Sequence, residues 1–106
     1  MTKRAELFGI DDGELDGTRK QVEKILELSL EAHESEYHGG DYFKLSGADF
    51  NIVLQTNFIE DDGEPTEAEF PGVAILLYVN GERNCVDRMR AVLCQNGLKL
   101  LRSSTF

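Results

Sequence analysis

The residues of this chain with the clearest chemical meaning form an acidic cluster from Glu60 to Glu69. Six of these ten residues are carboxylates. The cluster connects two segments with the hydrophobic pattern of buried strands, and it is longer than the connections of about 2–6 residues that are usual in compact domains. Carboxylates concentrated in one connection attract a basic partner and favour its correct orientation. The expected partner contacts are Asp61, Asp62, Glu64, Glu67 and Glu69.

The charge of the whole chain has the same sign, with 20 Asp and Glu against 11 Lys and Arg and a formal net charge of -9. Residues 1–70 contain 18 acidic and 6 basic residues, whereas residues 71–106 contain 2 and 5. Affinity for nucleic acid comes mainly from Lys and Arg that neutralise phosphates, so the charge argues against direct nucleic-acid binding. Net charge also keeps small proteins in solution, but its concentration in one connection favours recognition.

Two histidines are the obvious candidates for catalysis. A hydrolase could use His38 with Asp41, because a carboxylate can orient an imidazole that acts as a general base. Packing and capping explain both histidines without catalysis: His33 falls on the apolar side of a predicted helix, and His38 falls in a turn at its end. We therefore expect no catalytic residue and no enzyme, with the hydrolase as a third alternative.

Metal binding has one partial motif. Its residues occupy the first, third, fifth, sixth and twelfth positions of a calcium loop and are Asp12, Glu14, Asp16, Gly17 and Glu23. Glu14 stands where a shorter side chain is usual, and Arg19 puts a cation in the loop. Carboxylates are also favoured near the N-terminus of a helix, so an acidic turn before a helix has the same residues as this motif. We expect an acidic turn, with no metal site and no cofactor.

The length of 106 residues predicts a single globular domain over residues 1–106. No stretch approaches the roughly 20 apolar residues of a membrane span, and residues 1–6 lack the apolar segment of a secretory signal. Cys85 and Cys94 fall in one predicted helix, too far apart to bridge, as reduced core thiols. We expect a cytoplasmic monomer or weak dimer that does not bind membranes.

The first half of the chain predicts a helix and a hairpin. Thr18 and Gln21 form a capping-box pattern, and the apolar spacing that follows predicts a helix over residues 19–36. Residues 41–45 and 50–58 predict two strands of a hairpin with one apolar face. The outer side of the helix is a second candidate surface for the partner, although a solvated helix face has the same composition. Its carboxylates are Glu23, Glu27, Glu31 and Glu34.

The second half predicts a strand, a helix and a strand. Residues 73–79 are apolar throughout, which is typical of a central strand. Asn84 and Gly97 delimit a helix with one apolar stripe, and residues 98–103 predict a last strand. A crossover of this length would set the two strands parallel. The predicted fold is α+β, with two helices on one face of a four-stranded, mixed, mainly antiparallel sheet in the order α-β-β-β-α-β.

Several segments together resemble small bacterial immunity proteins of polymorphic toxins, including those of contact-dependent growth inhibition systems. They are Tyr37-His38-Gly39-Gly40-Asp41-Tyr42-Phe43, Leu54-Gln55-Thr56-Asn57-Phe58, Asp61-Asp62-Gly63-Glu64, and Phe70-Pro71 leading to Leu76-Leu77-Tyr78-Val79. The similarity covers roughly the middle half of the chain. The resemblance implies a cytoplasmic inhibitor that binds one cognate toxin domain, often a basic nuclease, and has no catalytic residues of its own.

The residues and the resemblance agree on a mechanism. Carboxylates in the acidic cluster could imitate the phosphate spacing that a nuclease recognises and so occupy its cationic groove. The expected function is stoichiometric inhibition of a toxin domain. The alternative is an acidic adaptor or regulatory module that binds a basic host protein without inhibiting an enzyme.

Overall fold

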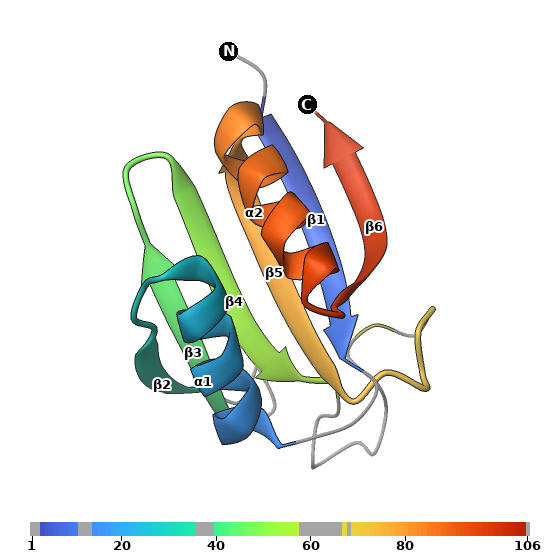
Figure 1. Ribbon diagram of the computed structural model, residues 1–106. Coiled ribbons are helices and arrows are strands. Elements are labelled where there is room, and N and C mark those ends of the chain that lie inside the picture. Colours follow the sequence, from blue (N-terminus) through green and yellow to red (C-terminus); the bar gives the residue numbers. More distant parts are fainter. Residues whose placement is uncertain (1–2, 11–13, 36–39, 58–66, 68, 106) are drawn as a thin grey trace.

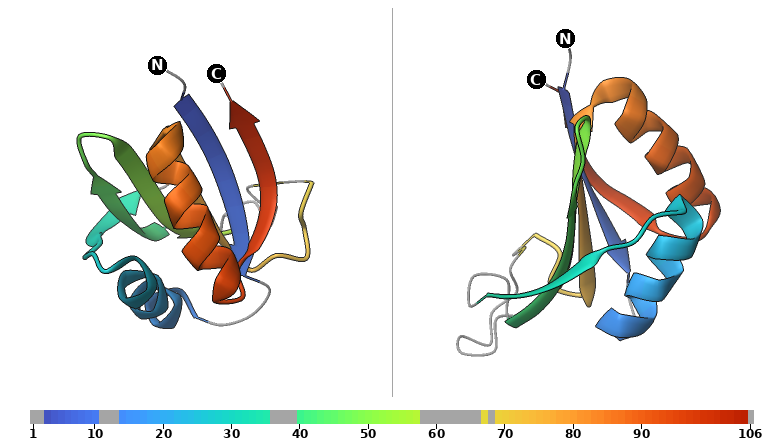
Figure 2. Two further views of the ribbon diagram at one scale, coloured as in Figure 1. Left: turned by 45° about the horizontal axis from the view of Figure 1, so that its top comes forward. Right: turned by 90° about the vertical axis from the view of Figure 1, so that its left-hand side faces the viewer.

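The computed structural model describes the chain except for residues 1–2, 11–13, 36–39, 58–66, 68 and 106. Six strands form one sheet in the order β2-β3-β4-β5-β1-β6, and two helices cover one of its faces, called the helix face below (Figures 1 and 2). The elements are β1 (Lys3–Ile10), α1 (Leu15–Leu26), β2 (Glu31–Ser35), β3 (Gly40–Ser46), β4 (Phe50–Thr56), β5 (Ile75–Glu82), α2 (Arg83–Gln95) and β6 (Lys99–Thr105).

The α+β class and the two helices on one face are confirmed, but the predicted sheet is wrong in detail. The sheet has six strands, and each of its neighbouring pairs is antiparallel in the described chain. The prediction missed β1 and β2. β5 and β6 run in the same direction, as the crossover predicted, but β1 lies between them and pairs with both. The sheet is therefore antiparallel and not mixed.

The first helix is shorter than predicted and begins earlier. Thr18 lies inside α1, where its hydroxyl donates to the Glu14 carbonyl 2.8 Å away, so it is not the cap. The helix ends at Glu27, which has a left-handed backbone with φ 56° and ψ 47°. The Leu28 N–H then bonds to the Glu23 carbonyl, in the manner of a helix C-terminal motif. The chain leaves the helix there, and residues 31–35, which were predicted to be helical, form β2.

The main core lies between the helices and the sheet. Residues of β1, β4 and β5 that point to the helix face are fully buried, as are the helix residues opposite them. Each such side chain contributes about 1.5–3 kcal/mol by leaving water, so this layer is the main source of stability. Its members with no exposed surface include Phe8, Val22, Ile52, Leu54, Leu77, Val79, Val86 and Leu93.

The opposite face of the sheet, called the far face below, has a smaller core. Leu7 and Leu76 pack there with Val73, and Tyr78 and Leu101 adjoin them. The segment that precedes β5 lies on this side of the sheet, away from both helices (Figure 2). One end of the far face is therefore covered by chain that leads out of the acidic cluster.

The pairing of β1 with β6 contains one irregularity. Leu7 pairs with Arg102, whereas the next residue, Phe8, pairs with Leu100. Leu101 is the extra residue of a β-bulge, and its side chain packs on the far face. Beyond the bulge, Arg102 points to the far face and Ser103 to the helix face, because side chains alternate along a strand.

Candidate functional site

The acidic cluster lies between β4 and β5. Three of the expected contacts, Asp61, Asp62 and Glu64, lie outside the described residues. The structure describes the two ends of the connection between β4 and β5. One is Asn57, directly after β4, and the other is the chain from Glu67 that leads into β5. Residues 58–66, called the acidic segment below, join these ends and contain four carboxylates and no basic residue.

Asn57 is fully buried and joins the two ends of the acidic segment. Its Nδ2 donates to the carbonyls of Phe70 and Val73, both at 2.8 Å. Its Oδ1 accepts from the Glu67 N–H at 2.9 Å, and its own N–H donates to the Ala74 carbonyl at 2.9 Å. All hydrogen-bonding groups of this side chain are used on the chain that returns to β5. The residues that flank the acidic segment, Asn57 and Glu67, are therefore hydrogen-bonded to each other.

Glu67 has an internal role that the sequence did not reveal. Its Oε1 accepts from the Tyr78 hydroxyl at 2.7 Å and from Arg102 Nη2 at 3.1 Å, and its Oε2 accepts from Arg102 Nη1 at 3.1 Å. This bidentate geometry is the strong form of an arginine–carboxylate pair. Only 17% of the Glu67 side chain is exposed. The residue that was expected to contact a partner is held by β5 and β6 of its own sheet.

These contacts shift the ionisation of all three groups. The hydrogen bond from Arg102, with help from the Tyr78 hydroxyl, holds the pKa of Glu67 below its ordinary value. Burial, and then the Glu67 carboxylate, raises the pKa of Tyr78. Glu67 raises the pKa of Arg102 in turn, and the charge of Glu69 adds to that effect. Glu67 is therefore an anion at neutral pH, and a lowered pKa makes it a poor general base.

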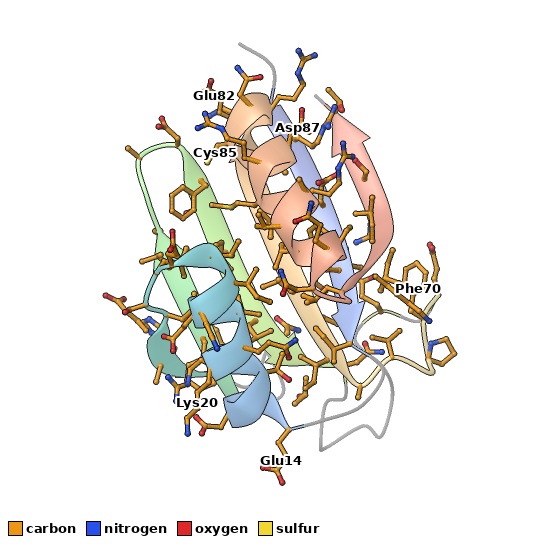
Figure 3. The ribbon with its side chains drawn as sticks, in the orientation of Figure 1. Glu14, Lys20, Phe70, Glu82, Cys85 and Asp87 are labelled. Carbon is orange, nitrogen blue, oxygen red and sulfur yellow. The ribbon has the colours of Figure 1, made fainter. Side chains whose placement is uncertain are left out.

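Glu69 is the remaining expected contact that the structure describes. It is exposed, two residues beyond Glu67. Phe70 follows it in the segment before β5 and lies at the end of the sheet away from the start of α2 (Figure 3). Of the two described carboxylates in the cluster, Glu69 is the one whose side chain faces solvent.

No family model matches this chain, and no curated protein gives a significant match. In the described parts of the chain, no helix is long and apolar enough to cross a membrane.

The second predicted acidic surface does not exist as one helix face. Glu23 lies in α1, but its carboxylate accepts from Arg19 at 2.9 Å and from the Leu30 N–H at 2.7 Å. Glu27 ends the helix, and Glu31 and Glu34 belong to β2. The helical spacing that grouped the four residues was wrong beyond Glu27.

The two histidines and the two cysteines were the remaining candidates. His33 lies on β2 and not on a helix, and its ring stacks on Tyr42 with centroids 5.4 Å apart. His38 lies outside the described residues. Cys85 and Cys94 are free and share α2, as predicted, but Cys94 is exposed and is not a core thiol.

Two carboxylates of the partial calcium motif make contacts within the protein. Asp16 pairs with Arg19 at 2.8 Å, and Glu23 pairs with the same arginine. The Arg19 hydrogen bond lowers the pKa of Asp16. Glu14 precedes α1 at the lower end of the molecule (Figure 3), and Asp12 lies outside the described residues. No group of three or more potential ligand residues that could hold a metal is found in the described chain.

A buried glutamate on β1 is a second polar site that sequence reasoning missed. Glu6 has no exposed side-chain surface, and its Oε2 accepts from Ser103 Oγ at 2.7 Å and from Arg90 Nη1 at 3.2 Å. Its Oε1 is buried without a hydrogen-bond partner in the part of the chain that the structure describes. Asp87 of α2 pairs with Arg4 of β1 beside this site, near the start of α2 (Figure 3). The signal was a single charged residue within residues 5–10, which are otherwise uncharged.

Proposed function

We propose that this protein is a cytoplasmic immunity protein that binds one basic toxin domain and neutralises it by stoichiometric blocking. The observation that carries the proposal is the closure of the acidic segment by Asn57. The fully buried Asn57 side chain hydrogen-bonds to the chain that follows the acidic segment. It thereby holds together the two ends of nine residues that contain four carboxylates. Connections whose two ends are held close together are frequently functional.

The charge of the segment supports a basic partner and a blocking mechanism. Asp61, Asp62 and Glu64 fall within four consecutive residues, and exposed Glu69 adds a carboxylate after Glu67. Anions at this density substitute for the phosphates that a nuclease binds, so a complex would leave its cationic groove occupied. Inhibition by occupancy needs no catalytic group in the inhibitor.

The alternative is an acidic adaptor that binds a basic host protein without inhibiting an enzyme. The same closed acidic segment supports it, because charge complementarity does not depend on what the partner does. The two functions differ in the identity of the partner and in the effect of binding on the partner's activity.

The test is a pull-down with the tagged protein from lysate of the source cells, at low and at high salt, with mass spectrometry of the retained proteins. The basic domain that is retained is then produced alone, and its nuclease activity is titrated with the protein. Inhibition that is complete at one equivalent supports the immunity function. A host protein whose activity does not change supports the adaptor.

Two triple variants give the titration a matched control. Asp61→Asn, Asp62→Asn and Glu64→Gln remove three charges from the acidic segment. Glu14→Gln, Glu27→Gln and Glu31→Gln remove the same charge from exposed positions elsewhere. The first variant should lose inhibition and the second should keep it. Equal losses would show that overall charge, and not this segment, attracts the partner.

A further inference from the structure

The sheet ends in two edge strands, β2 and β6. Among the described strands, β2 pairs with β3 alone and β6 pairs with β1 alone. An edge strand presents a row of main-chain donors and acceptors to any chain that can pair with it. The two edges lie on opposite sides of the molecule, and both helices cover the same face between them (Figures 1 and 2). Another strand can therefore reach either edge without displacing a helix.

The directions of the edge strands allow the sheet to continue from one copy of the chain into the next. Every neighbouring pair in the described sheet is antiparallel. Because the sheet has six strands, its first and last strands, β2 and β6, run in opposite directions. A second copy in the same orientation therefore brings its β2 antiparallel to β6 of the first, with the helices of both copies on one face.

The charges of the two edges favour this pairing over the alternatives. β6 contains Lys99 and Arg102 and no acidic residue, whereas the sequence of β2 contains two glutamates and no Lys or Arg. Charged residues on edge strands usually prevent pairing between molecules. Here like charges oppose the pairing of β6 with β6 and of β2 with β2, but opposite charges favour the pairing of β6 with β2.

Side-chain exposure selects a register for this pairing. Leu100 points to the helix face and is 38% exposed, one of two large apolar side chains exposed in the described part of the chain. Ala32 is exposed and points to the same face, because it pairs with Phe43, which packs on the main core. When Ala32 of one copy lies opposite Leu100 of the other, Glu31 lies beside Arg102 on the far face.

The two charged residues of this register keep exposed surface after the contacts within their own copy. Arg102 pairs with Glu67, and its side chain is still 43% exposed. Glu31 lies 3.5 Å from His33 Nε2, and its side chain is 75% exposed. An added contact between Glu31 and Arg102 therefore needs neither side chain to leave a buried position.

We propose that β2 of one copy of this chain pairs with β6 of the next, so that copies associate head to tail in one extended antiparallel sheet. The inference does not depend on the proposed function. The contact uses two different surfaces, so it does not close at two copies. It is weak, because a strand of five residues buries less area than a standard interface and each copy has a net charge of -9.

Sedimentation equilibrium of the wild-type protein from about 0.02 to 2 mM tests the association. The average mass should rise with concentration and pass that of a dimer. Glu31→Lys should raise the Kd about five- to tenfold, because it places a cation beside Arg102. Glu14→Lys makes the same charge change at an exposed position before α1 and is the matched control. It should associate no more weakly than the wild-type protein.

The apolar part of the contact has its own pair of variants. Leu100→Asn should raise the Kd about three- to tenfold, because it removes the side chain that the second copy covers. Val92→Asn removes the other exposed large apolar side chain, which lies on α2 and at neither edge of the sheet. This control should keep the wild-type Kd.

A mixture of the two edge variants tests the head-to-tail geometry. Glu31→Lys keeps an intact β6 edge, and Leu100→Asn keeps an intact β2 edge. At a concentration at which each variant alone is monomeric, an equimolar mixture should form dimers with one copy of each and no larger species. If two β6 edges paired with each other, Glu31→Lys alone would associate as strongly as the wild-type protein, and the inference would be overturned.

Hydrogen exchange locates the contact. Main-chain amides in residues 99–105 should exchange more slowly as the protein concentration rises, whereas exchange of the Leu77 N–H in the central strand should not change. A wild-type mass that stays at the monomer value up to the highest concentration would overturn the inference. Equal weakening by Glu14→Lys and Glu31→Lys would do the same. Neither result affects the proposed function, which the pull-down tests separately.

Discussion

The two faces of the sheet each hold a glutamate that accepts from one arginine and one hydroxyl, yet the two sites differ in how completely the carboxylate is satisfied. On the helix face, both donors bind one oxygen of Glu6 and leave the other buried and unpartnered among the described residues. On the far face, both oxygens of Glu67 are bonded. The donors are Arg90 and Ser103 for Glu6, and Arg102 and Tyr78 for Glu67.

The difference indicates different roles. A buried ion pair seldom adds stability over apolar residues of the same size, because desolvation offsets the attraction. Glu6 sits between a helix and a sheet where such apolar residues would fit. Glu67 joins the chain before β5 to Tyr78 and Arg102 at a partly exposed position, where an apolar side chain would leave both donors without an acceptor. Neighbouring residues of β6, Arg102 and Ser103, serve the two sites from opposite faces.

The largest effect should come from Asn57→Ala, which detaches the far-face site from β4. The variant leaves two carbonyls and the Glu67 N–H without partners, and we expect a loss of about 3 kcal/mol in the free energy of unfolding. Urea denaturation measures it. Asn80→Ala, at an exposed position of β5, should change stability by less than about 0.5 kcal/mol. Similar values for both would show that the closure of the acidic segment contributes no stability.

Variants of Glu6 should show how much its charge and its volume each contribute to stability on the helix face. Glu6→Ala removes the closer carboxylate from Arg90, whose contact with Asp87 is 3.7 Å, and opens a cavity, so we expect a loss of about 2 kcal/mol. Replacing both partners of the ion pair, Glu6→Met together with Arg90→Met, keeps the volume without leaving an unpaired charge and should be neutral within about 0.5 kcal/mol, or stabilising. Urea denaturation of both variants gives the comparison. A double Met variant as unstable as the Ala variant would contradict the proposed contrast between the faces.

Replacement of the glutamate by Met on the far face should not be tolerated. Glu67→Met leaves the Tyr78 hydroxyl and Arg102 without their acceptor, and we expect a loss of about 1 kcal/mol, since the pair is partly exposed. Thermal denaturation measures the shift. Glu69→Met at the exposed position nearby is the control and should be close to neutral. A stable Glu67→Met variant would remove the distinction between the two glutamates.

Acid should weaken the far-face site gradually. The pKa of Glu67 is lowered in the folded protein from its ordinary value of 4.5, so the unfolded chain binds its proton first as pH falls. The contribution of Glu67 is complete above that value and is lost as pH falls through the lowered pKa. The stability difference between the wild-type protein and Glu67→Gln, below about 1 kcal/mol, should shrink between pH 6 and pH 3 in urea titrations. A difference that does not change with pH would show that the charge of Glu67 contributes nothing.

Local patterns predicted the elements whose burial follows a simple period. The alternation in β4, the apolar run in β5 and the stripe in α2 each gave the correct element within a few residues. β1 was missed because Arg4 and Glu6 interrupt the alternation at positions that face α2 and are neutralised there. The partners that make those charges tolerable are far away in the sequence.

The end of the first helix could not be predicted for a similar reason. Glu27 adopts the left-handed conformation that usually calls for glycine, and the side chain of Glu23 binds the Leu30 N–H beyond it. Neither signal appears in the periodicity, and β2 is an exposed edge strand with little pattern of its own. The carboxylates of the acidic cluster were identified from composition, but the internal bonds of Asn57 and Glu67 depend on tertiary structure.

The bulge at Leu101 is a position at which β6 could lose one residue without a change in how Arg102 and Ser103 pair with β1. Removal of this residue would make the ladder with β1 regular and would leave Arg102 opposite Leu7 and Ser103 opposite Glu6. One residue inserted directly after Arg102 would instead turn Ser103 toward the far face and deprive Glu6 of its hydroxyl donor. Loss of Leu101 should therefore keep the alignment of both glutamate sites and remove only its own apolar contacts, whereas an insertion one position later should disrupt the Glu6 site.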